Sequence, residues 1–197
     1  MTRVRLLILL AAAALTLAVA SVPRRADVAS AQARGGAKSA TPAAESPCDL
    51  WAYVLDPDPQ GLNVRSGPGK QFAAVAKLPH VEYSLEVHVT GASGQWLRVS
   101  EASEQDSGKE VFKGAGWVYG PALGTDTKDY GGTDPNEPRV KLYKEASARS
   151  SVVLRLPNET EVALTGCKGR WARVRHKNVE GWLAPDSQCH STLTTCS

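Results

Sequence analysis

The chain has 197 residues, 42% of them hydrophobic, and a formal net charge of +3. Up to Ala31 it carries four Arg and one Asp; without that segment, 19 Lys and Arg stand against 19 Asp and Glu. The basic character is therefore largely a property of the N-terminal segment, which weakens the case for a nucleic-acid partner.

The first residues of the chain resemble an export signal. Arg3 and Arg5 precede the apolar run Leu6–Ala20, the arrangement of a secretory signal peptide. The run is shorter than the roughly 20 residues of a membrane helix. Cleavage after Ala20 or after Ala31 fits the small residues there. We expect a secreted or periplasmic protein without a membrane span after cleavage; an uncleaved short anchor is the alternative.

Residues 32–48 follow the predicted signal and cleavage region, residues 1–31. They are mostly Ala, Ser, Gly, Pro and Thr, with few large apolar side chains. A segment of this composition buries too little apolar surface to offset the entropy of ordering. We therefore predict a disordered tether.

An internal repeat organises the rest of the chain. Leu62–Arg65 alternates apolar and polar residues, as a half-buried strand does, and Ser66–Gly69 then forms a turn. A second apolar segment, Phe72–Leu78, ends at a proline. The same frame returns 78 residues later, with Val140 on Leu62, Leu142 on Val64, Leu156 on Leu78 and Pro157 on Pro79.

The repeat continues through paired tryptophans. Gly94 to Val99, with Trp96, corresponds to Gly169 to Val174, with Trp171, and each copy closes on a Gly-Trp pair. The first copy is longer between its tryptophans, where we predict an elongated hairpin loop at Glu101–Lys109. The predicted domains are residues 49–124 and 139–197, the second with a disulfide-tied tail, joined by a linker at 125–138. Short strands punctuated by Gly and Pro predict small all-β units.

These motifs resemble the bacterial Src-homology-3 (SH3) domain, a small five- to six-stranded β-barrel. The elements of the resemblance are LNVRSGPG, a segment ending in Leu-Pro, then Gly-x-Trp and Gly-Trp. It covers residues 51–123 strongly and 139–186 less strongly, because the second copy has KLYKEAS in place of NVRSGPG. The resemblance implies an all-β chain with two small SH3-like barrels in tandem. It also implies binding of cell-wall peptide or an envelope protein.

The resemblance further implies where the ligand binds. By position, Trp96 and Trp117 line the groove of the first unit, and Trp171 and Trp182 that of the second. Trp117 and Trp182 could instead be core residues. Tyr53 is the counterpart of the family's loop aromatics, and we expect a nearby acidic turn to meet a positive group on the peptide. The predicted ligand-binding residues are Tyr53, Asp56, Asp58, Trp96, Arg98, Trp117, Trp171, Arg173 and Trp182.

Four cysteines behind an export signal favour two disulfides. Antiparallel pairing of the strands after Cys167 would bring Cys189 close to it. We therefore expect Cys167 to pair with Cys189, and Cys48 with Cys196. The closest rival joins Cys48 to Cys167 and Cys189 to Cys196.

Other chemistries are weakly supported. Cys167, His176, Cys189 and His190 could form a Cys-His nucleophile or a zinc site, but structural disulfides and the lack of zinc-ligand spacings argue against both. We interpret the basic run from Arg170 to Lys177 as the solvent face of a strand, shared by Trp171, Arg173 and Arg175; attraction to an anionic polymer is the alternative. We expect a binding protein that is not an enzyme and has no metal or cofactor. A regulatory or inhibitory subunit of an envelope enzyme, or a purely structural envelope protein, is the alternative.

Overall fold

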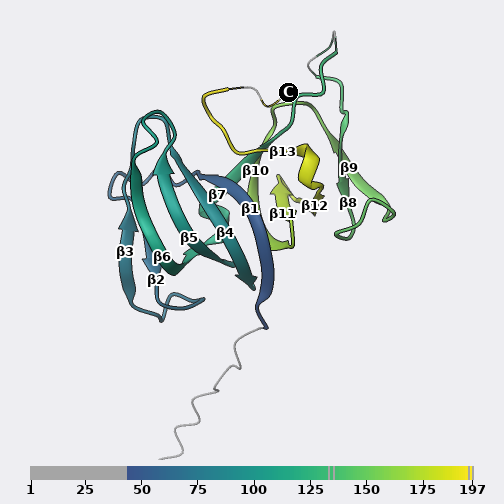
Figure 1. The fold of residues 1–197 in the computed structure, drawn as a ribbon. Coiled ribbons are helices and arrows are strands. Elements are labelled where there is room, and N and C mark those ends of the chain that lie inside the picture. The colour runs from purple at the N-terminus through teal and green to yellow at the C-terminus, as the bar shows by residue number, and fades with distance from the viewer. Residues whose placement is uncertain (1–43, 133, 135, 195, 197) are drawn as a thin grey trace, which may run out of the picture. The chain divides into compact units, whose positions relative to one another are not determined.

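Figure 1 shows the computed structural model of the chain, which describes residues 44–132, 134, 136–194 and 196. The predicted signal peptide and the predicted tether up to residue 43 lie outside the described residues. Within them the regular structure is strands and two short 3-10 helices, with no α-helix. The all-β prediction is confirmed.

The first unit is built from the strands β1 to β7 (Figure 1). They are β1 (Ser46–Val54), β2 (Leu62–Arg65), β3 (Ala74–Leu78), β4 (Leu85–Ser93), β5 (Trp96–Glu104), β6 (Glu110–Tyr119), the 3-10 helix η1 (Gly120–Ala122) and β7 (Leu123–Thr127). Neighbours in the order β3-β2-β6-β5-β4-β1-β7 pair antiparallel.

The second unit repeats this order. Its elements are β8 (Val140–Tyr143), β9 (Val152–Leu156), β10 (Glu161–Lys168), β11 (Trp171–His176), β12 (Val179–Leu183), the 3-10 helix η2 (Pro185–Ser187) and β13 (Gln188–Cys189). The sheet continues from β7 as β10-β11-β12-β8-β9. Each unit thus has two paired short strands, then three antiparallel strands, a 3-10 turn and a closing strand.

Strand β7 belongs to both units. In the first unit, β1 pairs with β4 and with β7. In the second unit β7 takes the place of β1, because it pairs with β10 and with β13. The two copies of the pattern therefore share one strand, and the hydrogen-bonded network runs through both without a break.

One apolar core supports both copies. Side chains that alternate inward along the strands are fully buried, among them Val64, Leu97 and Val118 in the first unit and Leu142 and Val174 in the second. These residues belong to a single contiguous cluster. A barrel of this size buries only about 60% of its unfolded surface when it folds alone. The shared strand and shared core supply packing that one copy would lack.

The predicted linker and tether are partly wrong. Residues 125–127 of the predicted linker lie in β7, where Thr125 and Thr127 are buried. The Thr125 hydroxyl donates to the Cys189 carbonyl at 2.7 Å, and the Thr127 hydroxyl donates to the Pro157 carbonyl at 2.7 Å. A threonine can be buried when its hydroxyl is hydrogen-bonded. The polar sequence of this segment did not reveal that these two threonines would find such partners. Strand β1 likewise starts at Ser46, inside the predicted tether.

Four of the nine residues of the predicted hairpin loop, 101–104, lie in a strand. β5 continues through Glu104 and β6 starts at Glu110, so only the intervening turn is irregular. Ala102 is 1% exposed, so its side chain packs into the core and holds this end of β5 in place. The loop also carries a contact, since the Gln105 side chain donates to the His190 carbonyl at 2.9 Å.

The favoured disulfide pairing is wrong, and the rival is observed. Cys48 bonds to Cys167 with Cα atoms 5.8 Å apart, and Cys189 bonds to Cys196. The strands after Cys167 do return antiparallel. After η2, however, the chain crosses to β7, where Cys189 lies opposite Asp126. Cys189 is thereby carried away from Cys167.

Candidate functional site

Two aromatic side chains form one wall of a cavity on the first unit. Trp96 starts β5 and Tyr119 ends β6; they are Cα partners in the sheet, with ring centroids 5.8 Å apart. Their neighbours Leu97 and Val118 are fully buried. Because successive strand residues point to opposite faces, Trp96 and Tyr119 both project away from the core.

Charged residues border the same cavity, which has a volume of about 430 Å³. The complete lining is Asp56, Asp58, Gly61, Leu62, Asn63, Arg65, Lys70, Trp96 and Tyr119. Acidic groups therefore come from the turn before β2, and basic groups from the end of β2 and the loop after it. A peptide with charges of both signs would find partners here.

Local hydrogen bonds hold the acidic turn in place. Asp56 Oδ1 accepts from the Asp58 amide at 3.1 Å, and Asp58 Oδ1 accepts from the Gln60 amide at 2.8 Å. Gly61 then has a φ of +80°, and a Cβ there would lie 2.2 Å from the Leu78 carbonyl oxygen. Glycine is required at this position. It sets the angle at which the acidic turn enters β2.

Arg65 closes the opposite, basic side. Its Nη1 donates to the Phe72 carbonyl at 2.8 Å and to the Lys70 carbonyl at 3.3 Å. The guanidinium therefore bridges the ends of the loop that the RSGPG sequence forms. This contact gives the arginine of that motif a structural role beside its place in the cavity.

In the first unit, the structure brings three predicted site residues together and leaves three others, Tyr53, Arg98 and Trp117, outside the cavity. Asp56, Asp58 and Trp96 line one cavity. Trp117 is half-buried on β6, with Arg65 and Arg98 as its Cα partners on the neighbouring strands, and it does not line the cavity.

Arg98 is engaged elsewhere. Its Nε lies 2.8 Å from Glu45 Oε1. It lies on the same outward face of β5 as Trp96, two residues away. The ion pair with Glu45 would therefore compete with a ligand for the Arg98 guanidinium.

Tyr53 is not part of this cavity, contrary to our expectation. It is 3% exposed, and its hydroxyl donates to Asp126 Oδ1 at 2.7 Å. Burial, and then the bond to Asp126, raise the pKa of the Tyr53 phenol. At Tyr53 the strand β1 takes β7 as a second partner, which covers the side chain. Alternation along β1 could not reveal that change of partner.

The second unit presents a different surface. Tyr143 stands where the first unit has Arg65, and its ring meets Trp171 edge-on at 5.7 Å. Trp171 lines a cavity of about 490 Å³ with Glu45, Ser46, Pro47, Ala146, Lys168 and Gly169. The start of β1 thus forms a wall of the second unit's cavity.

The other predicted residues of the second unit are occupied. Arg173 Nη2 lies 2.8 Å from Glu180 Oε2, and Arg175 pairs with the same carboxylate. Trp182 is half-buried between Arg173 and Tyr143, its Cα partners. The prediction that Trp171 and Arg173 share the solvent face is consistent with the burial of Ala172 and Val174 between and beside them.

Sequence reasoning missed part of the first cavity. Tyr119, Asn63, Arg65 and Lys70 line it and were not predicted. Tyr119 could have been found, because it lies two residues after Trp117 and so on the same face of β6. Lys70 carried no such signal, since its place depends on the path of the loop.

Comparisons with known proteins locate the family resemblance. Residues 138–187 match the family model described as "Bacterial SH3 domain". This segment is a bacterial SH3 domain. The first unit has the same succession of strands around the shared strand β7, which makes it a second SH3-like region by strand layout.

One curated relative is a much longer protein. The chain is 23% identical over 133 residues to "Putative N-acetylmuramoyl-L-alanine amidase YrvJ" of Bacillus subtilis (strain 168). The match covers 66% of this chain and 24% of the relative. The chain therefore spans about a quarter of the relative's length.

Two solved structures were also compared. NlpC1 of Trichomonas vaginalis is 13% identical, covering 71% of this chain and 45% of that chain, with a TM-score of 0.27. NlpC2 of the same organism is 11% identical, covering 76% and 51%, with a TM-score of 0.29. Likenesses at these TM-scores carry no argument about function.

In the described part of the chain, no helix has the length and apolar character needed to cross a membrane.

Proposed function

We propose that this chain is an exported, non-enzymatic binding protein of the bacterial cell envelope. Its first unit would hold an extended peptide, from the cell wall or from an envelope protein, against Trp96 and Tyr119. The supporting observation is the cavity in which these two rings meet two carboxylates and two cations. Aromatic faces supply contact area at a low entropic cost, and the charges orient the peptide.

Two further findings support the cell envelope as the setting. Residues 138–187 are a bacterial SH3 domain, and the curated relative is named for an activity on N-acetylmuramoyl-L-alanine. The four cysteines form two disulfides, which persist in oxidising compartments outside the cytosol. Both points agree with the signal peptide predicted from the sequence.

The disulfides also bear on the enzyme alternative. With Cys48, Cys167, Cys189 and Cys196 all oxidised, no cysteine thiolate is available as a nucleophile. The proposal of a non-enzymatic protein rests on this point and on the cavity's resemblance to a peptide groove.

Retention on purified murein tests the proposal, with Trp96→Ala as the decisive variant. Losing a central aromatic contact typically costs a binding protein about 2 kcal/mol or more, so we expect binding to fall by more than about tenfold. Trp171→Ala is the matched control, because Trp171 packs on Tyr143 in the second unit. We expect it to bind nearly as wild type does.

Folding must be checked alongside, by circular dichroism and thermal melting. A folded Trp96→Ala protein that binds both murein and envelope extract as wild type does would refute the groove. A second variant, Tyr119→Ala, removes the other ring, which is 38% exposed, and should weaken the same binding.

A regulatory partner of an envelope hydrolase is the second candidate. The observation that favours it is the match to part of a longer protein named as an amidase. Retention by an envelope extract but not by purified murein would select this candidate over direct binding to the cell wall.

A further inference from the structure

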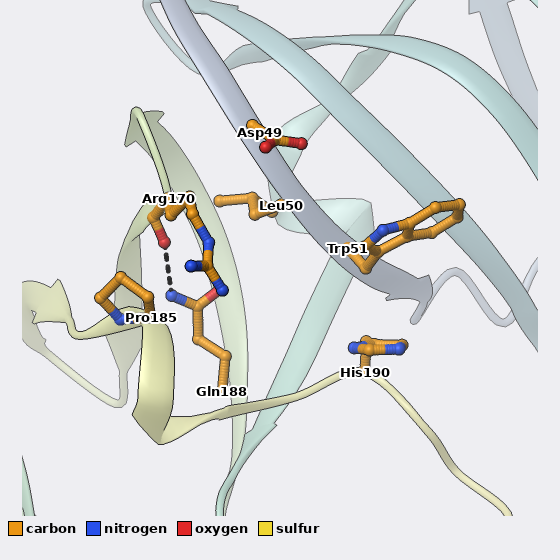
Figure 2. Close-up of a pocket in the computed structure, with 7 residues that line it drawn as sticks. All are labelled: Asp49, Leu50, Trp51, Arg170, Pro185, Gln188 and His190. Atoms are coloured by element: carbon orange, nitrogen blue, oxygen red, sulfur yellow. Dashed lines mark hydrogen bonds between the residues drawn. The ribbon is translucent and has the colours of Figure 1, made fainter.

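A second cavity, of about 410 Å³, lies beside β1. Figure 2 shows the residues that line it: Asp49, Leu50, Trp51, Arg170, Pro185, Gln188 and His190. They come from β1, from the turn between β10 and β11, from η2, from β13 and from the C-terminal tail. None of them was predicted to bind a ligand.

The backbone of this cavity is firmly held. The Gln188 side chain donates to the carbonyl of Arg170 at 2.8 Å, the bond dashed in Figure 2, and also to the carbonyls of Leu183 and Ala184. The Asp49 amide donates to the Gly169 carbonyl at 2.9 Å. The turn that carries Arg170 is therefore fixed both to β13 and to β1.

Arg170 brings an uncommitted positive charge to this rigid turn. Among the described residues, its guanidinium has no acidic partner and no hydrogen bond. By contrast, Arg98, Arg173 and Arg175 all form ion pairs with glutamates. A guanidinium presents paired N–H donors that match a carboxylate.

Trp51 adds a second donor. Its ring stacks on His88 at 4.7 Å and packs against His190 at 6.2 Å. Figure 2 shows the indole nitrogen on the side of the ring toward Arg170. Among the described residues no acceptor bonds to this N–H. Because the two imidazoles pack against the ring, a ligand would contact the indole N–H at the ring edge rather than stack on the ring face.

The histidines are themselves fixed by carboxylates. His88 Nε2 lies 3.0 Å from Asp49 Oδ1, and His190 Nε2 lies 2.8 Å from Glu86 Oε1. Asp49 remains 72% exposed at the side chain, so one acidic group is left at the rim. Leu50 and Pro185 complete the lining with apolar surface.

We propose that this cavity binds an α-carboxylate carried beside a small apolar side chain, from the end of a peptide or from a free amino acid. Arg170 and the Trp51 N–H meet the carboxylate, while Leu50 and Pro185 contact the side chain. In a free amino acid, Asp49 faces the ammonium group. The volume lies within the range of small-molecule pockets. The site is separate from the groove of the proposed function and shares no residue with it.

The chemistry disfavours two other ligands. A sugar ring would need an open aromatic face, and both histidines pack on Trp51. A phosphate would place two charges next to a single guanidinium and the Asp49 carboxylate, which would repel it. A single carboxylate carries one charge, so Asp49 repels it less than a phosphate, and a small apolar side chain needs no open aromatic face.

Calorimetric titration of the purified protein, with both disulfides formed, tests the proposal. The probes are L-alanine, L-alanyl-L-alanine, N-acetyl-L-alanyl-L-alanine and the C-terminal amide of the last. We expect the acids to bind and to shift the NMR signal of the Trp51 indole N–H, and the amide to do neither. Equal binding of the acetylated and free dipeptides assigns the site to peptide ends; binding of free alanine alone assigns it to amino acids, with Asp49 engaged.

Variants separate this site from the first groove. Arg170→Gln should weaken the binding of the acids by about tenfold or more, since a charge-assisted hydrogen bond contributes about 1.5 to 3 kcal/mol. Arg155→Gln, at an exposed position of β9, is the matched control and should leave binding unchanged. Trp96→Ala should also leave this binding intact. Equal binding of acid and amide, an unaffected Arg170→Gln, or no binding at millimolar concentration would overturn the proposal, whatever the outcome on murein.

Discussion

Cys48 at the start of the first unit is disulfide-bonded to Cys167 in the second, 119 residues further along the chain. Backbone bonds flank this link, because the Gly169 amide donates to the Pro47 carbonyl at 2.8 Å and the Asp49 amide donates to the Gly169 carbonyl at 2.9 Å. The first strand of one unit is therefore fastened to a hairpin of the other, both covalently and by hydrogen bonds.

This link should dominate the contribution of disulfides to stability. In the chain-entropy model, closing a loop of about 120 residues stabilises the fold by about 5 kcal/mol, and closing the short Cys189–Cys196 loop by about 2.5 kcal/mol. We expect Cys48→Ser with Cys167→Ser to lower the free energy of unfolding about 2 kcal/mol more than Cys189→Ser with Cys196→Ser. Denaturant unfolding of both double variants measures the difference, and a larger loss in the second would contradict it.

The turn at the tip of the β5–β6 hairpin should hold the C-terminal tail. Gln105 Oε1 accepts from the Thr192 amide at 2.8 Å and from its hydroxyl at 3.0 Å, and Gln105 Nε2 donates to the His190 carbonyl. These bonds are partly exposed, so each contributes about 0.5 to 1.5 kcal/mol. Gln105→Ala should speed amide hydrogen exchange at Thr192. Asp106→Ala, in the same turn, should leave that rate unchanged.

The parts of the fold that follow simple alternation were predictable from the sequence. Trp96 could be placed outside because Leu97 is apolar, and the repeat aligned the strands of both units. β7 could not be predicted in the same way. Thr125 and Thr127 look like linker residues, and they are buried only because their hydroxyls bond to carbonyls from the second unit.

The cavities were harder to predict than the strands. Asp56 and Trp96 line the same cavity, as expected, but Tyr53 is turned inward where β1 changes partner. The second cavity combines Trp51 with Arg170, residues far apart in the sequence. Their proximity depends on the link between β1 and the second unit, which no local pattern reveals.

The glycine of each Gly-Trp pair should be needed for packing. A Cβ at Gly116 would lie 2.2 Å from Val64 Cγ1, whereas one at Gly181 would lie 2.9 Å from Leu142 Cβ. Overpacking of this kind typically costs about 1 to 3 kcal/mol. Thermal melting should therefore show both alanine variants destabilised, with Gly116→Ala the more affected. Gly166→Ala is the control, because its backbone φ is not positive and the nearest atoms to a Cβ there, in Arg173, lie 3.7 Å away.

Asp126 should make stability depend on pH in mildly acidic solution. Burial raises the pKa of its carboxyl in the folded protein, and the charges of Glu161 and Glu159 raise it further, although the bond from Tyr53 lowers it. In the unfolded chain an aspartate titrates near about 3.9. Between that value and the raised folded pKa, the folded state binds more protons, so the stabilising contribution of the protonated carboxyl is lost as the pH rises through this window.

Asp126→Asn removes this dependence and keeps an acceptor for the Tyr53 hydroxyl. We expect the variant to gain stability relative to wild type as the pH rises from about 4 to 7, measured as the urea midpoint at each pH. Asp106→Asn, on the exposed hairpin turn, should follow wild type throughout. If wild type and Asp126→Asn keep a constant difference across this range, then Asp126 does not titrate with a raised pKa, and the proposed balance between its burial and the Tyr53 hydrogen bond is wrong.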